Sequence, residues 1–264
     1  MKKINLTPAA TVLVLRDTDN GMEVFLVKRS ARPPFGNLFV FPGGKVDQDD
    51  SEKNIADLCE GLDDVQASES LGIGSGGLAY WVACVRECFE EVGILLAKKR
   101  DGSLLDLNGV EKEKYTSYRE MLLKNEISLY EICKTEALIL TMDNLAPFSH
   151  WITPEIEERR FDTRFFIARL PDNQTGEHDG SELTDSLWIN PKEALKKAFN
   201  GDIQMIMPTI KNLQQCENYD SASKLLEDQK KLTSEDIPAI LPKFFKKDGN
   251  WVGLLPDDPD YKNH

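Results

Sequence analysis

Residues 86–94 read Arg-Glu-Cys-Phe-Glu-Glu-Val-Gly-Ile, and this run decides the fold. On a helix, Glu87 would precede Glu90 and Glu91 by three and four residues, so the three carboxylates would share one face. Like charges within one helical turn repel each other and weaken an isolated helix. A hard divalent cation such as Mg²⁺ or Mn²⁺ offsets this repulsion, because it prefers carboxylate oxygens. The run therefore predicts a metal-binding helix, with a solvated acidic helix face as the alternative.

The helix that carries this run is predicted over residues 78–96. Apolar residues recur along it at spacings of three and four, the pattern of one buried stripe: Val82, Val85, Phe89, Val92 and Leu96. The three carboxylates lie on the opposite face. The helix is therefore expected to bury one face and to present its acidic residues on the other.

The rest of the chain mixes strands and helices. Asn20-Gly21, a strong signal for a hairpin turn, separates two β-rich runs at residues 11–15 and 23–27. Further elements are predicted downstream: strands at residues 149–152, 161–170 and 187–189, then a helix at residues 191–199. Because these elements do not alternate strictly, the sequence predicts an α/β fold with a mixed sheet. The Pro-rich tail, residues 237–260, is expected to wrap the surface.

The composition excludes several classes of protein. Of the 264 residues, 41% are hydrophobic and 29% charged, which argues against a disordered chain. No run of about 18 apolar residues is present, so no membrane association is expected. The net charge of −13 would repel a polyanion, so no nucleic-acid polymer is expected as a partner. The five cysteines lack CxxC pairs, which indicates reduced thiols, no zinc site and a cytoplasmic location.

Residues 86–94 resemble the second half of the Nudix box, G-x5-E-x7-R-E-U-x-E-E-x-G-U, where U is a bulky aliphatic residue. Residues 41–47, Phe-Pro-Gly-Gly-Lys-Val-Asp, resemble its first half. Gly44 matches the leading glycine, and Asp50 occupies the place of the first glutamate. The seven residues that usually precede the arginine are here 35, residues 51–85. The box is therefore split by an insertion.

A split box resembles the Nudix subfamily that includes peroxisomal acyl-coenzyme A diphosphatases and their bacterial relatives. Residues 151–166 and 187–195 are similar to further segments of that subfamily. The resemblance implies a Nudix-type α/β/α sandwich with a mixed sheet, helical insertions and a C-terminal helical extension. We expect a Nudix domain over residues 1–215, with insertions at about 51–77 and 111–140. Residues 216–264 would form the extension, packed on the same domain.

The resemblance also implies the chemistry of the acidic helix. A Nudix box binds Mg²⁺ or Mn²⁺ and serves to hydrolyse a diphosphate linked to another group. By position, Glu90 and Glu91 would be metal ligands, and the carbonyl of Gly43 a further one. Glu87 would be a metal ligand or the base that activates water, and Arg86 would orient the glutamates.

The base need not lie in the box, because family members differ in this respect. Glu182 ends the acidic loop at residues 177–182, just before the strand predicted at residues 187–189. We expect it to act as an additional metal ligand or as the base, with plain solvation of the loop as the alternative.

Basic residues close to the box indicate where a substrate would bind. Lys28, Arg29 and Arg32 lie upstream of it and partly match the coenzyme A signature of some Nudix proteins. They suit a 3′-phosphate or the phosphates of an adenine nucleotide, unless they form a solvated strand end. Arg164 is a fourth candidate phosphate contact.

The predicted function is hydrolysis of a diphosphate in a small-molecule substrate. Coenzyme A or acyl-coenzyme A would give 3′,5′-ADP and (acyl-)4′-phosphopantetheine. The alternatives are a Nudix hydrolase of ADP-ribose, NADH or a nucleotide sugar, and a Nudix-fold binding module that lacks catalysis. A homodimer is compatible with the sequence.

Overall fold

A mixed β-sheet forms the centre of the molecule. The computed structural model describes residues 6–31, 36–178, 180 and 182–263. Its main sheet has the strand order β10-β2-β1-β9-β8-β11, with β3 paired to β2 and β4 paired to β1. These strands are β1 (Thr7–Thr18), β2 (Gly21–Arg29), β3 (Phe39–Val40), β4 (Gly43–Lys45), β8 (Leu145–Ile152), β9 (Phe161–Arg169), β10 (Leu183–Ile189) and β11 (Ala239–Ile240).

The first two strands form the hairpin that Asn20-Gly21 predicts. Thr18 pairs with Gly21 at its end, and the Thr18 hydroxyl donates to the Gly21 carbonyl at 2.8 Å. Strand β1 also runs parallel to β9, while β9 and β8 are antiparallel. The sheet is therefore mixed, which confirms the expectation from the sequence.

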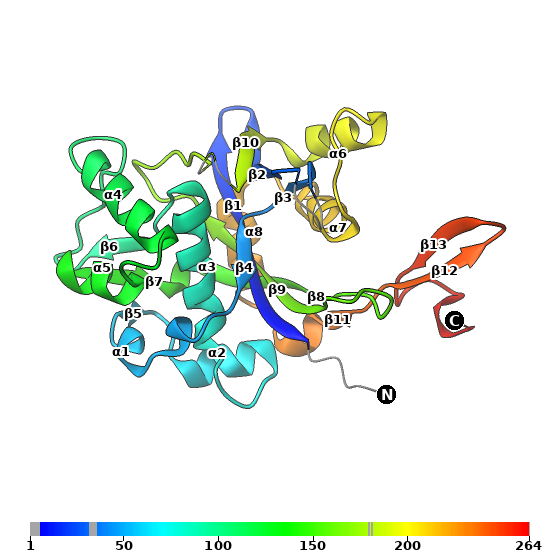
Figure 1. Cartoon of the computed structure of the whole chain (residues 1–264), viewed down its shortest axis with the longest axis horizontal. Coiled ribbons are helices and arrows are strands. Elements are labelled where there is room, and N and C mark those ends of the chain that lie inside the picture. Colours follow the sequence, from blue (N-terminus) through cyan, green and yellow to red (C-terminus); the bar gives the residue numbers. More distant parts are fainter. Residues whose placement is uncertain (1–5, 32–35, 179, 181, 264) are drawn as a thin grey trace.

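Side-chain alternation along β1 divides the interior into two cores. Val12 and Val14 enter one core, and Leu13 and Leu15 enter the other. Helix α3 (Leu78–Val92) covers the first face. The other face is covered by α6 (Pro191–Asn200), α7 (Met207–Cys216) and α8 (Ala222–Gln229). Figure 1 shows the sheet between these two groups of helices, so the predicted α/β/α sandwich is confirmed.

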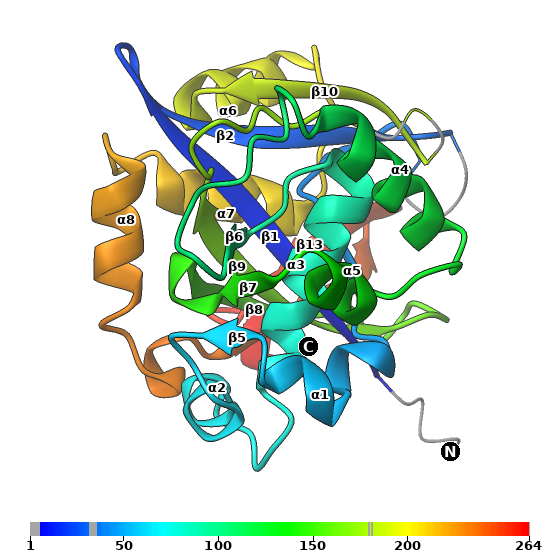
Figure 2. The same cartoon turned by 90° about the vertical axis from the view of Figure 1, so that its left-hand side faces the viewer.

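The two predicted insertions come together beside α3. The first contains α1 (Lys53–Ala56), β5 (Cys59–Glu60) and α2 (Asp64–Leu71). After α3 the chain forms β6 (Ala97–Lys99), α4 (Lys112–Leu123), α5 (Leu129–Thr135) and β7 (Leu138–Thr141). Strand β7 pairs with both β5 and β6, so the insertions share one small sheet. Figure 2, which looks at this side, shows α4 and α5 next to α3.

Helix α3 is shorter than its pattern predicts. It ends at Val92 because Gly93 adopts the left-handed conformation, with φ of 67°, and its N–H caps the helix by donating to the Phe89 carbonyl. Leu96 therefore lies beyond the helix, although it is still buried in the same core.

The C-terminal tail does not wrap the surface as expected. Strand β11 joins the edge of the main sheet beside β8. Strands β12 (Lys243–Lys247) and β13 (Asn250–Leu254) then form a hairpin that projects from the body in Figure 1. Asp248 and Gly249 make the turn with positive φ values of 51° and 84°. This Asp-Gly pair is a hairpin signal that the count of prolines obscured.

No helix among the described residues is both long and apolar enough to cross a membrane. All five cysteines are free. Burial raises the pKa of the Cys59 and Cys133 thiols to about 12, so both stay protonated at neutral pH.

We expect that Leu225→Ala will lower the free energy of unfolding by about 2–5 kcal/mol, because it leaves a cavity under α8. Leu225 is fully buried in the second core. The control Leu232→Ala, at a leucine that is 40% exposed, should change it by no more than about 0.5 kcal/mol. Urea denaturation followed by tryptophan fluorescence measures both. Equal effects would contradict the expectation that residues 216–264 are integral to the domain.

Candidate active site

The two glycines after Pro42 let strand β4 pass between β1 and α3. A Cβ on Gly43 would lie 2.5 Å from the Ala10 carbonyl oxygen, and one on Gly44 would lie 2.2 Å from Oε1 of Glu87. The Gly43 N–H donates to Oε2 of Glu91 at 2.8 Å. Only glycine fits at position 43, where φ is 156° and the neighbouring atoms belong to the backbone, whereas a side chain at position 44 would displace the Glu87 carboxylate.

Arg86 joins the two halves of the split box. Its Nε and Nη2 donate to the two carboxylate oxygens of Asp50 at 2.8 and 2.9 Å, and Nη2 also donates to the Lys45 carbonyl at 2.8 Å. Its Nη1 donates to Glu87 and to Glu90, each at 2.9 Å. Asp50 belongs to the 3₁₀ helix η1 (Asp49–Ser51) and is only 2% exposed. The first-glutamate position of the box is therefore occupied by a buried counter-charge for Arg86.

The acidic face of α3 is covered rather than solvated. Glu87 and Glu91 are each 9% exposed, because β4 lies against them. Burial raises the pKa of Glu87 to about 7, although Arg86 acts in the opposite direction. Burial also raises the pKa of Glu91 well above its usual range, and the neighbouring Glu87 adds to this. The alternative of a solvated helix face is therefore wrong.

The donor chemistry of this face fits a hard divalent cation. Glu87, Glu91 and the Gly43 backbone line one cavity and offer carboxylate and carbonyl oxygens. Two adjacent buried carboxyls with raised pKa values also favour a partner that brings positive charge. Among the described residues, however, no three His, Cys, Asp or Glu side chains form a ready-made ligand cluster. Arg86 holds Glu87 and Glu90 by hydrogen bonds from its Nη1.

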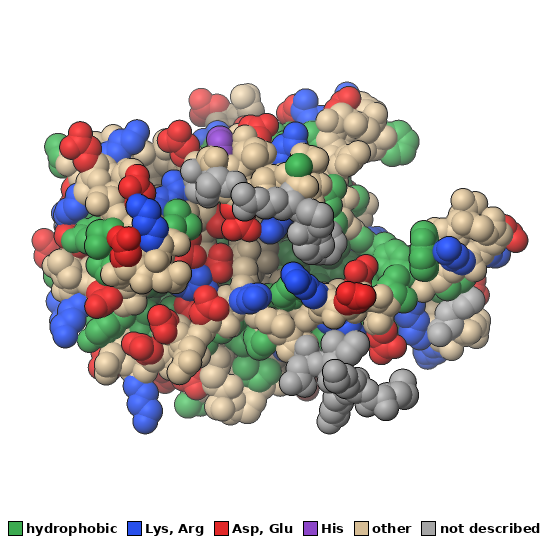
Figure 3. All heavy atoms as spheres, viewed as in Figure 1, with side chains coloured by type: hydrophobic (Ala, Val, Ile, Leu, Met, Phe, Trp, Pro, Cys, Tyr) green, Lys and Arg blue, Asp and Glu red, His purple; other side chains and the backbone are tan. Residues whose placement is uncertain are grey.

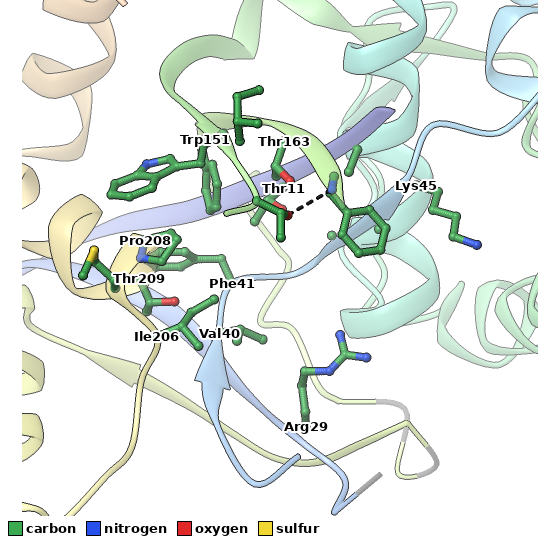
Figure 4. A pocket seen from close by; sticks show the side chains of 18 of the residues that line it. Thr11, Arg29, Val40, Phe41, Lys45, Trp151, Thr163, Ile206, Pro208 and Thr209 are labelled. Carbon is green, nitrogen blue, oxygen red and sulfur yellow. Dashed lines mark hydrogen bonds between the residues drawn. The ribbon is translucent and has the colours of Figure 1, made fainter. Parts of the chain in front are cut away.

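The cavity has a volume of about 710 Å³ and two chemically different ends. One end has Glu87 and Glu91, together with Arg29 and Lys45, the basic residues that line it among the residues described. The other end is apolar. In Figure 4, Trp151, Ile206 and Pro208 lie on one side of the cavity, and Arg29 and Lys45 on the other. Figure 3 shows acidic side chains at the centre of this face and hydrophobic ones toward the projecting hairpin.

The predicted base and one predicted basic residue meet at the mouth of this cavity. Glu182 lines it and accepts a hydrogen bond from Nη2 of Arg29 at 3.0 Å. Glu182 is close enough to Glu91 to contribute to its raised pKa. The structure therefore brings Glu182, which precedes β10, beside the carboxylates of α3.

The other predicted residues lie elsewhere. Glu90 faces a smaller cavity of about 210 Å³ next to Arg86. Nζ of Lys28 lies 5.9 Å from the centre of the Phe39 ring. Nη1 of Arg164 donates a hydrogen bond to the Leu71 carbonyl at 2.9 Å. Neither Lys28 nor Arg164 is among the described residues that line the main cavity. Arg32 lies outside the described residues.

The comparisons with known proteins identify the family of the chain. The family model of the NUDT19 Nudix domain matches residues 63–216, more than half of the chain. The chain belongs to the Nudix family. It is 28% identical over 270 residues to the acyl-coenzyme A diphosphatase NUDT19 of Xenopus laevis, a match that covers 90% of this chain and 71% of that protein. It is 25% identical over 281 residues to the protein of the same name from Gallus gallus, covering 90% and 74%.

A solved structure supports the Nudix fold. The crystal structure of a NUDIX hydrolase from Alicyclobacillus acidocaldarius matches with a TM-score of 0.70 and 24% identity, over 85% of this chain and 97% of that one. Together with the family match, this identifies the protein as a Nudix hydrolase, an enzyme that cleaves a diphosphate linkage. The alternative of a binding module without catalysis is therefore set aside. Nudix hydrolases generally use a divalent metal ion.

Sequence reasoning missed Arg119, a residue that holds the end of the Nudix helix α3. Arg119 is on α4, in the second insertion, and its guanidinium donates to the Glu90 and Glu91 carbonyls at 2.9 and 2.6 Å. A cation at the C-terminus of a helix is favourable, because the last carbonyls carry partial negative charge. The insertion thus positions the turn that carries two of the box glutamates. Nothing in the local sequence signals this contact, because it joins residues far apart in the chain.

We expect Arg86→Met to lower the free energy of unfolding by about 3–5 kcal/mol, because it leaves Asp50 and two glutamates buried without their counter-charge. Urea denaturation at neutral pH measures the change. The control is Arg169→Met, at a guanidinium that is 51% exposed and 3.8 Å from Asp172, where a change of no more than about 1 kcal/mol is expected. A small effect of Arg86→Met would show that the Arg86 network does not hold the two halves of the box together.

Proposed function

We propose that this Nudix hydrolase cleaves the diphosphate of coenzyme A or acyl-coenzyme A, releasing 3′,5′-ADP and (acyl-)4′-phosphopantetheine. The observation that carries the proposal is the single cavity that joins buried carboxylates and two basic side chains to an apolar end. Such a substrate has the same order of groups: anionic phosphates, then a long pantetheine arm and an acyl chain. The names of the Xenopus laevis and Gallus gallus relatives support the same substrate class.

In this proposal Glu87, Glu90, Glu91 and the Gly43 carbonyl would hold Mg²⁺ or Mn²⁺. Bound there, such a cation would supply positive charge to offset the anionic phosphate oxygens. Glu90 would contribute after release from Arg86, which holds it at 2.9 Å. Asp50 keeps the Arg86 guanidinium in place while this happens.

The remaining residues bind the substrate and move the proton. Arg29 and Lys45 line the cavity beside the carboxylates, and both suit phosphate oxygens. Of the three proposed basic residues that the structure describes, Lys28, Arg29 and Arg164, only Arg29 lines the cavity. Glu182, held beside Arg29, is well placed to take a proton from the attacking water. Glu87 is the second candidate base, since its pKa near 7 suits proton transfer at neutral pH.

Product analysis tests the substrate. The purified protein is incubated with coenzyme A, acetyl-coenzyme A, ADP-ribose and NADH, each with Mg²⁺, with Mn²⁺ and with EDTA. We expect metal-dependent release of 3′,5′-ADP from the coenzyme A species and none with EDTA. Cleavage of ADP-ribose or NADH alone would overturn the substrate and keep the diphosphatase chemistry.

Glu91→Gln and Glu90→Gln test the metal ligands. We expect each to lower kcat by about 100-fold or more, because an amide binds a hard cation much less well than a carboxylate does. The fold should survive, as checked by circular dichroism. The control Glu193→Gln changes a glutamate on α6 that is 59% exposed and should keep full activity. Wild-type turnover in both box variants would contradict the ligand assignment.

A further inference from the structure

We propose that the C-terminal segment at residues 242–254 closes the apolar end of the cavity and that Phe244 selects the acyl chain of the substrate. The inference rests on the proposed coenzyme A diphosphatase function and deepens it. Residues 242–254 lie outside the part of the chain that the Nudix family model matches, residues 63–216. The residues that would set the specificity therefore lie in the C-terminal segment.

The apolar end is continuous with the catalytic end, which decides what it can hold. Trp151 and Phe165 on the sheet, Met207 at the start of α7, and Pro242 and Phe244 of the tail line the same cavity as Glu87 and Glu91. A group bound there must belong to the molecule whose diphosphate lies at the carboxylates. In the proposed substrate, the apolar part remote from the diphosphate is the acyl chain. Trp151, Phe165, Met207 and Phe244 offer this chain an apolar surface to pack against.

Phe244 is held in place by close packing at the base of the hairpin. Gly253 on the opposite strand has no side chain, and a Cβ there would lie 2.7 Å from Cε1 of Phe244 and 3.2 Å from the Met207 methyl carbon. The ring of Phe244 therefore packs directly on the β13 backbone, beside Met207. A ring fixed in this way can limit the length of a chain in the cavity, whereas a mobile ring would move aside.

The segment that carries Phe244 is anchored on both sides. Upstream, Ile240 of β11 pairs with Trp151 of β8, so the segment starts from the edge of the main sheet. Downstream, Tyr261 returns to the base of the hairpin, where its hydroxyl donates to the Leu241 carbonyl at 2.7 Å. Its own carbonyl accepts from Nζ of Lys243 at 2.9 Å. These contacts make residues 241–244 a fixed wall, although the rest of the hairpin projects from the body.

The outer part of the same hairpin provides a matched control. Trp251 on β13 is 61% exposed and is not among the described residues that line the cavity. Nζ of Lys246 lies 5.3 Å from the centre of its ring. Truncating Trp251 removes an aromatic ring of the hairpin without changing the cavity wall.

The experiment measures kcat/KM of the full chain with Mg²⁺ for coenzyme A and for its acetyl, octanoyl and palmitoyl thioesters. Phe244→Ala enlarges the apolar end, so we expect the palmitoyl-to-acetyl ratio to rise by about tenfold or more, since a single methylene is worth roughly 10-fold in an apolar pocket. The kcat/KM for coenzyme A itself, which has no acyl chain, serves as the reference for each variant. Trp251→Ala should leave the ratio unchanged.

A second variant tests the same role in case Phe244→Ala does not fold. Phe244→Trp keeps an aromatic ring and narrows the cavity, so it should lower the same ratio. Unchanged ratios in both Phe244 variants, or an equal shift in Trp251→Ala, would overturn the role of Phe244 while leaving the diphosphatase function intact. If the wild type cleaves ADP-ribose but none of the coenzyme A species, the proposed function fails and the chain-selecting wall fails with it.

Discussion

The contact between the Arg86 guanidinium and the Asp50 carboxylate is the interaction on which the site depends. Both groups are almost fully buried, and a buried charge is tolerated only when it is paired and fully hydrogen bonded. Arg86 meets that condition by binding Asp50, Glu87, Glu90 and the Lys45 carbonyl together. The same contacts fix strand β4 against α3. An insertion between the two halves is tolerated because only its ends must be held, and closing a longer loop adds little entropy cost.

Local sequence patterns predicted most of the strands and helices. Alternation along β1 and the helical spacing of Val82, Val85 and Phe89 predicted the sheet and the helix that covers it. The helix end was misplaced because Leu96 continues the apolar stripe while Gly93 ends the hydrogen-bonded turn. The expectation that the tail wraps the surface was also wrong, because it gave more weight to the proline content than to the Asp248-Gly249 turn signal. In both cases the backbone conformation of a glycine, Gly93 or Gly249, determined the local structure more than the composition around it did.

The site could be predicted mainly where its residues belong to a recognisable motif. Residues 86–91 and Gly43-Gly44 carry a recognisable pattern, and the structure places them side by side. Arg119, the shared sheet of the two insertions, and Phe244 could not be found in this way. Each depends on contacts across a large part of the chain, and a single sequence records no such pairs. Lys28 and Arg29 illustrate the limit at short range, because neighbouring residues on a strand face opposite sides and only Arg29 lines the cavity.

The arrangement separates chemistry from recognition. The groups that would act on the diphosphate lie on β4 and α3, and they are fixed by the Arg86 network and by Arg119. The apolar end is built by the sheet, the start of α7 and the C-terminal extension. Binding energy gained at the remote end can still assist the reaction, provided that it orients the diphosphate at the carboxylates. A rigid Phe244 wall does this in a way that a flexible tail cannot, because a chain that stops at a fixed wall places its diphosphate at a defined distance from Glu87 and Glu91. Substrate preference can therefore change at one wall while the hydrolytic centre stays the same.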